Sequence, residues 1–424
     1  MATLTRREVL AAGLAIGGTA ASALAPWPAR AATAPSARRF LFIYASGGWD
    51  PLCAFATHLE GPEVQAEPEA TVAMAGSIPY VSHPRRPSVD RFFEQHHQSL
   101  AVVNGLHVPS VSHAVALRLM TTGNVSAAGG DWATRIAAAQ AEDFLVPHLL
   151  VGGPGFFGEM GMFVARASTS SQLADLSSGQ ILLNSDLAVG LPAPTDSNAV
   201  DAWLAEQNQS RAQETAAQAQ LVQGYGSSLE RAEQLGALGA ELSLSGGEAF
   251  TDQLRLGVDA LALGLSRSVT LNHPERSALT RWDSHSNSHM QQSELFEDLF
   301  AHLLTLAQTL ATTPGVQAPT LAEEVVVVVL SEMGRTPLLN SAGGKDHWPY
   351  TSALLFGPGV RGGQVLGGFD AGLVGQKLDP ESGAVHSDGI LAGQDTLGAT
   401  LMELAGADPF DAGYQGPLLS ALID

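Results

Sequence analysis

The sequence predicts an α/β protein built on a central, mostly parallel β-sheet. The run Val325–Leu330 contains six consecutive aliphatic residues, five of them β-branched, and this composition is typical of a strand buried on both faces of a sheet. A second apolar strand is expected at 39–44, and Gly47 and Gly48 follow it, where they allow a sharp turn at the strand end. Helical patterns lie between such strands, as expected for an α/β fold.

The remaining elements are assigned from apolar patterns and from the residues that bound them. A serine-led helix closed by glycine is expected at 110–123, and a long amphipathic helix at 291–312. Further strands are expected at 100–105, 144–151 and 352–357, and further helices at 89–98, 131–140 and 396–405. The segment 56–90 is rich in Pro and Ser and predicts irregular cover. The segment 196–266 is rich in Ala, Gln, Glu and Leu and predicts a helical insertion, with helices at roughly 198–221, 226–240 and 248–266.

The N-terminus has the pattern of an export signal. Arg6 and Arg7 precede a weakly apolar run, and Pro28-Ala29-Arg30-Ala31 closes it with an A-x-A cleavage pattern. This arrangement resembles a twin-arginine signal. The run is too short and too weakly apolar for a stable membrane span, which needs about 20 apolar residues. We therefore expect a signal peptide at 1–31, a single domain at 32–424, contact with the twin-arginine translocase during export, and a periplasmic or secreted protein; an uncleaved anchor is the alternative.

Composition limits the classes of partner. The chain has 42 acidic and 21 basic residues and a formal net charge of −21, which argues against nucleic acid as a partner because phosphate contacts need clustered Lys and Arg. Cys53 is the only cysteine, so no internal disulfide can form. Stability outside the cytoplasm must then come from packing or from a metal.

Acidic and imidazole side chains recur where strands end. Asp50 follows the strand at 39–44, and Glu332 follows the strand at 325–330. Asp283 and His285 are two residues apart, so in an extended segment they point the same way and could bind one ion. Taken singly, each such residue is more often structural than chemical.

Together, these residues favour a metal site at the carboxyl edge of the sheet. Ligands of open α/β sheets bind at the carboxyl ends of the strands. A mixed set of carboxylates and imidazoles suits zinc, or zinc combined with Mg or Mn. A divalent metal, with zinc favoured and one or two ions bound, is therefore expected.

Five motifs carry a resemblance to a known family. They are Gly47-Gly48-Trp49-Asp50, Ser112-His113 with Thr122-Gly123, Trp282-Asp283-Ser284-His285, Ser331-Glu332-Met333-Gly334-Arg335-Thr336-Pro337 and Gly344-Lys345-Asp346-His347-Trp348-Pro349. These segments resemble the signature blocks of the bacterial domain-of-unknown-function family 1501. The resemblance implies a relationship to the alkaline phosphatase and sulfatase superfamily, hence a three-layer α/β/α fold with two metals at the carboxyl edge of the sheet.

The resemblance also implies roles for individual residues. Asp50 resembles the first-strand metal aspartate, and Asp283 with His285 resembles the Asp/His metal pair. Glu332 stands where the superfamily has Asp followed by His, and Met333 replaces that His. The late metal histidine corresponds to His347, with Asp346 as a ligand or as a hydrogen-bonding partner.

Two alternatives remain open for the nucleophile. The phosphatase pattern puts His113 at the nucleophile's position and Ser112 one residue away. If Ser112 attacks, a covalent intermediate forms; if His113 is a metal ligand, water is the nucleophile. Arg335 could grip a phosphate or sulfate oxygen, or it could hold the loop by a salt bridge. A sulfatase is disfavoured because Cys53 lacks the Cys/Ser-x-Pro-x-Arg pattern.

Three functions follow from these observations. The first is an exported metal-dependent hydrolase of a small-molecule phosphate or related ester. The second is a catalytically silent metal-binding or secretion-associated protein that keeps the fold. The third is a structural or assembly protein whose helical insertion carries its role.

Overall fold

A computed structural model of the chain describes residues 34–124, 129–167, 194–211, 249–277 and 279–424, together with 215, 222 and 234–235. The chain divides into two compact units. The first consists of Met1–Ala165 and Ala249–Asp424, and the second of Arg166–Glu248. The predicted signal peptide and its cleavage site lie outside the described residues. Among the residues that are described, no helix combines the length and apolarity needed to cross a bilayer.

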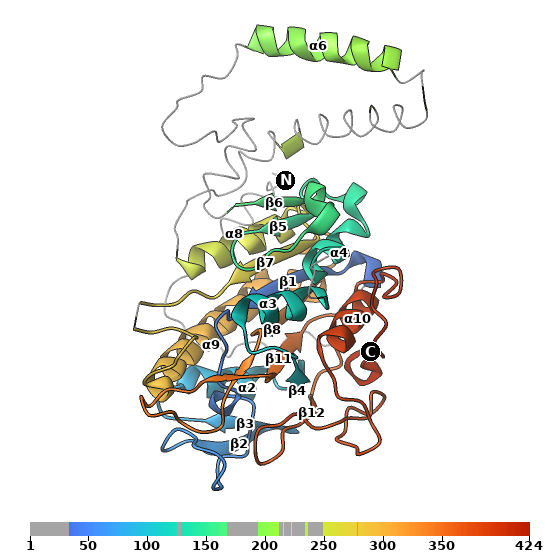
Figure 1. The fold of residues 1–424 in the computed structure, drawn as a ribbon. Helices are drawn as coiled ribbons and strands as arrows, with labels where there is room; N and C mark the ends of the chain where they lie inside the picture. Colours follow the sequence, from blue (N-terminus) through green and yellow to red (C-terminus); the bar gives the residue numbers. More distant parts are fainter. Residues whose placement is uncertain are drawn as a thin grey trace, which may run out of the picture. The chain divides into compact units, whose positions relative to one another are not determined.

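An eight-stranded sheet forms the centre of the first unit (Figure 1). The strand order is β12 (Gln364–Gly367), β4 (Leu100–His107), β11 (Tyr350–Phe356), β8 (Val325–Leu330), β1 (Arg39–Tyr44), β7 (Ser268–Asn272), β5 (His148–Leu150) and β6 (Val164–Arg166). β1 pairs in parallel with β7 and β8, β5 pairs in parallel with β7, and β12 pairs in parallel with β4. β11 runs antiparallel to its neighbours β4 and β8. The predicted mostly parallel sheet is confirmed.

Helices cover both faces of the sheet (Figure 1). Alternate side chains of a strand point to opposite faces, and the Phe40, Phe42 and Tyr44 side chains of β1 join one buried cluster with α3 (His113–Thr122), α4 (Trp132–Ala138) and α10 (Gln394–Leu404). The opposite face is covered by α2 (Pro87–His96), α8 (Phe250–Ala262) and α9 (Ser288–Thr312). This arrangement is the expected three-layer α/β/α fold.

Two parts of the first unit differ from the sequence prediction. The segment expected to be irregular contains a hairpin, in which β2 (Thr71–Ala75) pairs with β3 (Ile78–Ser82). Strand β7 was not predicted, and it lies between β1 and β5.

The predicted helical insertion is divided between the two units. α8 belongs to the first unit, and a Cβ on its Gly257 would lie 3.1 Å from the Val269 side chain of β7. In the second unit the structure describes α6 (Pro194–Arg211). Most of 212–248 lies outside the described residues.

The strand directions bring distant segments to one edge of the sheet. Tyr44 at the end of β1 is in register with Leu330 of β8 and with Asn272 of β7, so these three strands end at the same level. Because β11 runs antiparallel to β8, the chain before β11 also reaches this edge. There β9 (Gly334–Arg335) pairs with β10 (His347–Trp348), which places Arg335 opposite His347.

Candidate metal centre

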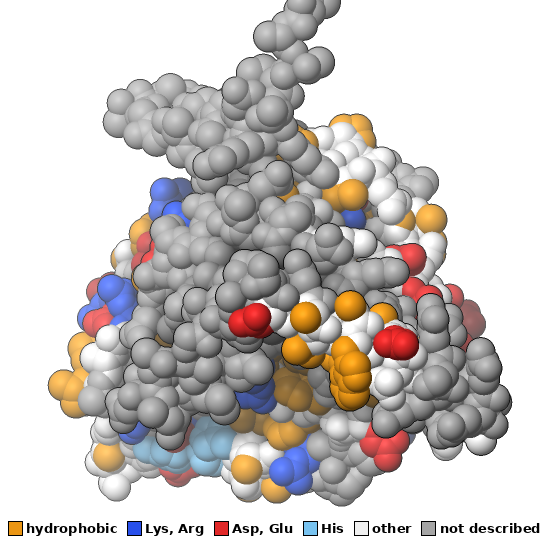
Figure 2. Space-filling view, turned by 90° about the horizontal axis from the view of Figure 1, so that it is seen from above, with side chains coloured by type: hydrophobic (Ala, Val, Ile, Leu, Met, Phe, Trp, Pro, Cys, Tyr) orange, Lys and Arg blue, Asp and Glu red, His pale blue; other side chains and the backbone are white. Residues whose placement is uncertain are grey.

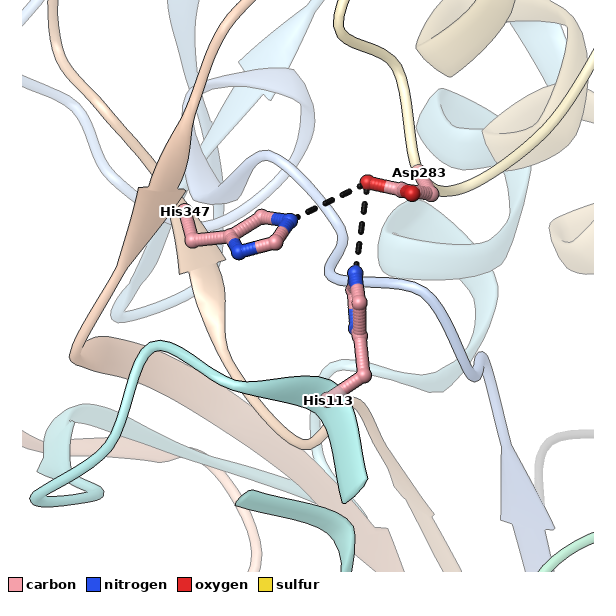
Figure 3. A group of neighbouring side chains, drawn as sticks. All are labelled: His113, Asp283 and His347. Atoms are coloured by element: carbon pink, nitrogen blue, oxygen red, sulfur yellow. Dashed lines mark hydrogen bonds and ion pairs between the residues drawn. The ribbon is translucent and has the colours of Figure 1, made fainter. Parts of the chain in front are cut away.

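A cluster of histidine and aspartate side chains lies at this carboxyl edge (Figure 3). His113 is the first residue of α3, Asp283 lies in the loop before α9, and His347 lies in β10. One ligand atom from each of these three residues lies within 4.8 Å of the other two. His285 joins the group, because its Nε2 lies 3.0 Å from Nε2 of His347 and 3.1 Å from Oδ1 of Asp283.

The Oδ1 atom of Asp283 is the point on which these side chains converge. It lies 3.3 Å from Nε2 of His113 and 3.2 Å from Nε2 of His347. Arg335 donates a hydrogen bond to the same oxygen from a terminal nitrogen, at 2.6 Å. Nε2 of His113 makes no hydrogen bond within the described residues, although it is buried and faces this oxygen.

The second nitrogen of each imidazole is held by an oxygen acceptor. Nδ1 of His113 lies 2.7 Å from Oε1 of Glu332, and Nδ1 of His285 lies 2.9 Å from Oδ1 of Asp346. Nδ1 of His347 lies 2.6 Å from the backbone carbonyl of Val111. When Nδ1 carries the proton and donates it to such an acceptor, the lone pair lies on Nε2. A histidine in this tautomer can bind a metal through Nε2.

The spacing of the ligand atoms fits a small divalent cation. Zinc binds imidazole nitrogen at about 2.0–2.1 Å in tetrahedral geometry, so its ligand atoms lie about 3.3 Å apart. The Nε2 atoms of His285 and His347 lie 3.0 Å apart. Oδ1 of Asp283 lies 3.1 Å from Nε2 of His285, 3.2 Å from Nε2 of His347 and 3.3 Å from Nε2 of His113. The chemistry of the donors, three imidazoles and one carboxylate, also suits zinc.

Neighbouring groups shift the pKa values of three residues in the site. The neighbouring carboxylates of Asp283 and Glu332 raise the pKa of His113 to about 9. Burial acts to raise the pKa of Asp283, but its contacts with His113 and Arg335 outweigh burial and hold that pKa well below its usual range. Hydrogen bonds from His285 and Asn340 lower the pKa of Asp346. Both aspartates are therefore ionised at neutral pH.

Glu332 and Asp50 lie beside the cluster, in hydrogen-bonded positions of their own. The Glu332 carboxylate accepts from Nδ1 of His113, from the Gly47 N–H and from the Ser331 hydroxyl, so it orients the histidine. The carboxylate of Asp50 is buried and pairs with the ammonium group of Lys345 at 2.7 Å. Its other oxygen accepts from the Leu52 N–H at the start of a short 3-10 helix.

Arg335 and Ser112 differ in their freedom to act on a ligand. The guanidinium of Arg335 is fully buried and donates to the backbone carbonyls of Gly47, Gly48 and Lys345 as well as to Asp283. It therefore holds the loops of the site in place. Ser112 is exposed and is the N-cap residue of α3, but its side chain makes no capping hydrogen bond.

Two glycines allow these loops to approach closely. Gly47 has φ +128°, and a Cβ there would lie 2.7 Å from the Cβ of Trp282, so a larger residue would displace the segment that carries Asp283. A Cβ on Gly344 would overlap the backbone of His285. The backbone N–H of Lys345 donates to the Ser284 carbonyl, which ties the two ligand-bearing segments together.

The cluster is accessible from solvent. The exposed fraction of the side chain is 46% for His285, 32% for Asp283, 30% for His113 and 22% for His347. In the space-filling view, histidine side chains gather at one margin of the visible surface, close to acidic groups (Figure 2). An ion at this position could exchange with solution and could meet a ligand.

Several supporting residues were not predicted from the sequence. Gln292 of α9 accepts from the Asp50 N–H and donates to the Trp282 carbonyl, so it joins the loop after β1 to the Asp283 segment. Lys345 lies within one of the sequence motifs, but its partner is 295 positions away. Nothing in the local sequence of either residue indicates these contacts.

The fold and the cluster define an α/β protein with a candidate metal centre at the carboxyl edge of its sheet. The sequence profile of a family described as "Protein of unknown function (DUF1501)" matches residues 37–392, and the chain belongs to this family. The family named on the strength of the sequence motifs is thus confirmed. A sequence search of curated proteins found no significant match.

Solved structures that resemble the chain are distant. One is a protein in the alkaline phosphatase superfamily from Vibrio parahaemolyticus, with 10% identity and a TM-score of 0.37, where the match covers 95% of this chain and 74% of that one. Another is a sulfatase from Pseudoalteromonas sp., with 10% identity and a TM-score of 0.39, where the match covers 91% and 72% of the two chains. These similarities are too low to assign an activity.

Proposed function

We propose that this protein is an exported, metal-dependent hydrolase that acts on a phosphate or related ester. The observation that supports the proposal is the convergence of three imidazole Nε2 atoms on one oxygen of Asp283, with each Nδ1 held by an oxygen acceptor. Without a cation, the Nε2 lone pairs of neutral His285 and His347 would face each other at 3.0 Å and the Asp283 carboxylate at 3.1 and 3.2 Å, which is unfavourable at a partly buried site.

In this proposal the side chains have separate roles. His113, His285, His347 and Asp283 bind the ion, and zinc is the ion that their chemistry favours. Glu332 and Asp346 orient two of the imidazoles. When bound, a divalent ion polarises an ester oxygen and lowers the pKa of water, which is the chemistry that ester hydrolysis needs.

The nucleophile is either the Ser112 hydroxyl or water. Ser112 is exposed, lies one residue before the ligand His113, and has a hydroxyl that makes no capping bond. A hydroxyl at the start of α3 would also be favoured by the positive end of the helix as charge develops on it. Ser112→Ala distinguishes the two: turnover falls by two orders of magnitude or more if serine attacks, and is nearly unchanged if water attacks.

The proposal is tested with the purified protein loaded with zinc, manganese or magnesium and assayed on phosphomonoester, phosphodiester and sulfate-ester substrates. We expect hydrolysis of a phosphate ester by the wild type and its loss in His347→Ala. His289→Ala is the matched control, because His289 lies on the first turn of α9 and contacts the Gln65 carbonyl rather than the cluster. Equal activity in wild type and His347→Ala would refute metal-dependent hydrolysis at this site.

A second function, metal binding without turnover, is favoured by one observation. Of the two alternatives for Arg335, gripping an anionic group of the substrate or holding the loop by a salt bridge, the contacts favour the second, because its guanidinium is buried and donates to four protein oxygens. Stoichiometric metal with no hydrolysis of any of the three ester classes would favour this function. The export signal and the twin-arginine route belong to the proposal in either case, and detection of the mature chain cleaved after Ala31 tests them.

A further inference from the structure

The residues that the sequence resemblance implies for a second metal are committed to protein partners. The resemblance implies two metals at the carboxyl edge of the sheet, and the histidine cluster around Asp283 accounts for one candidate ion. Asp346 supports that cluster through its hydrogen bond with an imidazole. The implied residues left over are Asp50 and Glu332, with Met333 at the position of an expected histidine. The contacts of these three side chains decide whether a second ion fits.

Asp50 already pairs with a cation of the protein. Its Oδ2 atom lies 2.7 Å from the ammonium nitrogen of Lys345, and the two side chains are 2% and 0% exposed. Its Oδ1 atom accepts a hydrogen bond from the Leu52 N–H at 3.1 Å. A divalent ion bound to Oδ2 at about 2.0–2.2 Å would lie within about 5 Å of the ammonium group. Water screens such a repulsion little at a buried site.

Glu332 and Met333 do not offer a second ion a ligand atom. Oε1 of Glu332 accepts hydrogen bonds from Nδ1 of His113 at 2.7 Å and from the Gly47 N–H at 2.9 Å. Oε2 accepts from the same N–H at 3.1 Å and lies 3.1 Å from the Ser331 hydroxyl. Met333 is fully buried in the apolar cluster on one face of the sheet. These two side chains therefore support the first site and the core.

The contrast with Asp283 shows why only one ion fits. Arg335 pairs with Asp283 at 2.6 Å, but three imidazole nitrogens also lie 3.1–3.3 Å from the same oxygen. Among the residues that the structure describes, no imidazole pairs with Asp50. Zinc sites draw three or four ligands from the protein, so Asp50 by itself does not form one.

We propose that the centre binds a single divalent ion, and that the ammonium group of Lys345 is the resident cation at Asp50, where the resemblance implies a second metal. This inference rests on the proposed function, because it takes the ion between Asp283 and His347 as bound. An ammonium group suits the place, since it is a compact charge on a flexible stem. The backbone N–H of Lys345 also donates to the Ser284 carbonyl. The pair therefore joins the loop after β1 to the segment before β10 without a metal.

The test counts cobalt ions bound per chain by spectroscopic titration of the full-length protein, with zinc content measured in parallel. The main variant is Asp50→Asn/Lys345→Met, which removes both charges of the pair and leaves neither buried charge uncompensated. We expect this double variant to bind as many ions as the wild type with the same affinity, and His347→Ala to bind one fewer. Lys377→Met, which changes an exposed lysine, should bind as the wild type does.

The outcomes separate this inference from the proposed function. An ion lost in the double variant would show that Asp50 binds a metal and would overturn the inference, while a loss in His347→Ala would still support the first site. Equal counts in wild type and His347→Ala would refute the first site, and the proposed function and this inference would fall together.

Electron paramagnetic resonance of the manganese-loaded wild type decides the question if the double variant does not fold. One ion in the centre gives an uncoupled signal, and we expect this result. Two ions about 3.5–4 Å apart, as in two-metal sites, give a spin-coupled signal, which would overturn the inference.

Discussion

The buried ion pair between Asp50 and Lys345 gives the sharpest stability prediction. The two charged atoms lie 2.7 Å apart, and the side chains are 2% and 0% exposed. Lys345→Met keeps the length of the side chain but removes its charge, which leaves the Asp50 carboxylate buried and uncompensated. Breaking a buried pair on one side costs about 3–5 kcal/mol, so the unfolding equilibrium constant should rise by roughly two to four orders of magnitude.

Urea denaturation of the metal-free protein, followed by tryptophan fluorescence, measures this cost. Lys377→Met is the matched control, because Lys377 is the only other lysine in the sequence and is exposed; we expect it to change the free energy of unfolding by less than about 0.5 kcal/mol. Adding Asp50→Asn to Lys345→Met should restore part of the loss, with a coupling free energy of about 0.5–3 kcal/mol. Equal losses in Lys345→Met and Lys377→Met would show that the pair contributes no stability.

Three further predictions concern other parts of the chain. Asp346→Ala removes the acceptor that orients His285 and should weaken zinc binding roughly 10–100-fold in a competition titration, with an unchanged melting temperature because Asp346 is 60% exposed. Gly344→Ala should weaken zinc binding at least roughly tenfold, because the new Cβ would overlap the His285 backbone. Gly343→Ala has room for a Cβ and should lose only about 1 kcal/mol of stability, which comes from its φ of +67°. Equal zinc affinities of the two variants would contradict this prediction. Burial raises the pKa of Asp259 to about 6, so the wild type loses stability as pH rises from about 4 through 6, and Asp259→Asn should match it below pH 4 but exceed it by about 3 kcal/mol above pH 7. Urea denaturation across this pH range checks the last prediction, and parallel curves would contradict it.

The centre of the fold could be predicted from the sequence because its strands are continuous apolar runs. Val325–Leu330 and Arg39–Tyr44 are fully buried and pair in parallel, as their composition indicated. Strand β7 was missed because Ser268 and Thr270 interrupt its apolar pattern. Both are buried, and Thr270 is bonded to Nε2 of His148, a partner that local periodicity cannot reveal.

The hairpin of β2 and β3 was missed for a different reason. Three of the five residues of β2 are exposed, so the strand lacks the apolar alternation that signals a half-buried sheet. It is held by pairing with β3, whose Ile78, Tyr80 and Val81 side chains are buried. Tertiary contacts, rather than strand propensity, decide the structure of this segment.

The candidate site was only partly accessible to sequence reasoning. The two-residue spacing pointed to Asp283 and His285, the family resemblance pointed to His347, and the structure brings these three together with His113. The strand-end rule pointed to Asp50, but a buried lysine 295 positions away occupies its carboxylate. A pairing of this range depends on how the loops after β1 and before β11 meet, which neither spacing nor composition specifies.

A crystal structure of the protein with zinc, analysed by anomalous scattering at the zinc edge, tests the central claim most directly. The account predicts an anomalous peak about 2.0–2.2 Å from Nε2 of His347 and from a carboxylate oxygen of Asp283, with His113 and His285 completing the ligand set. A map without a peak at this position, from crystals holding zinc in excess over protein, would contradict the account.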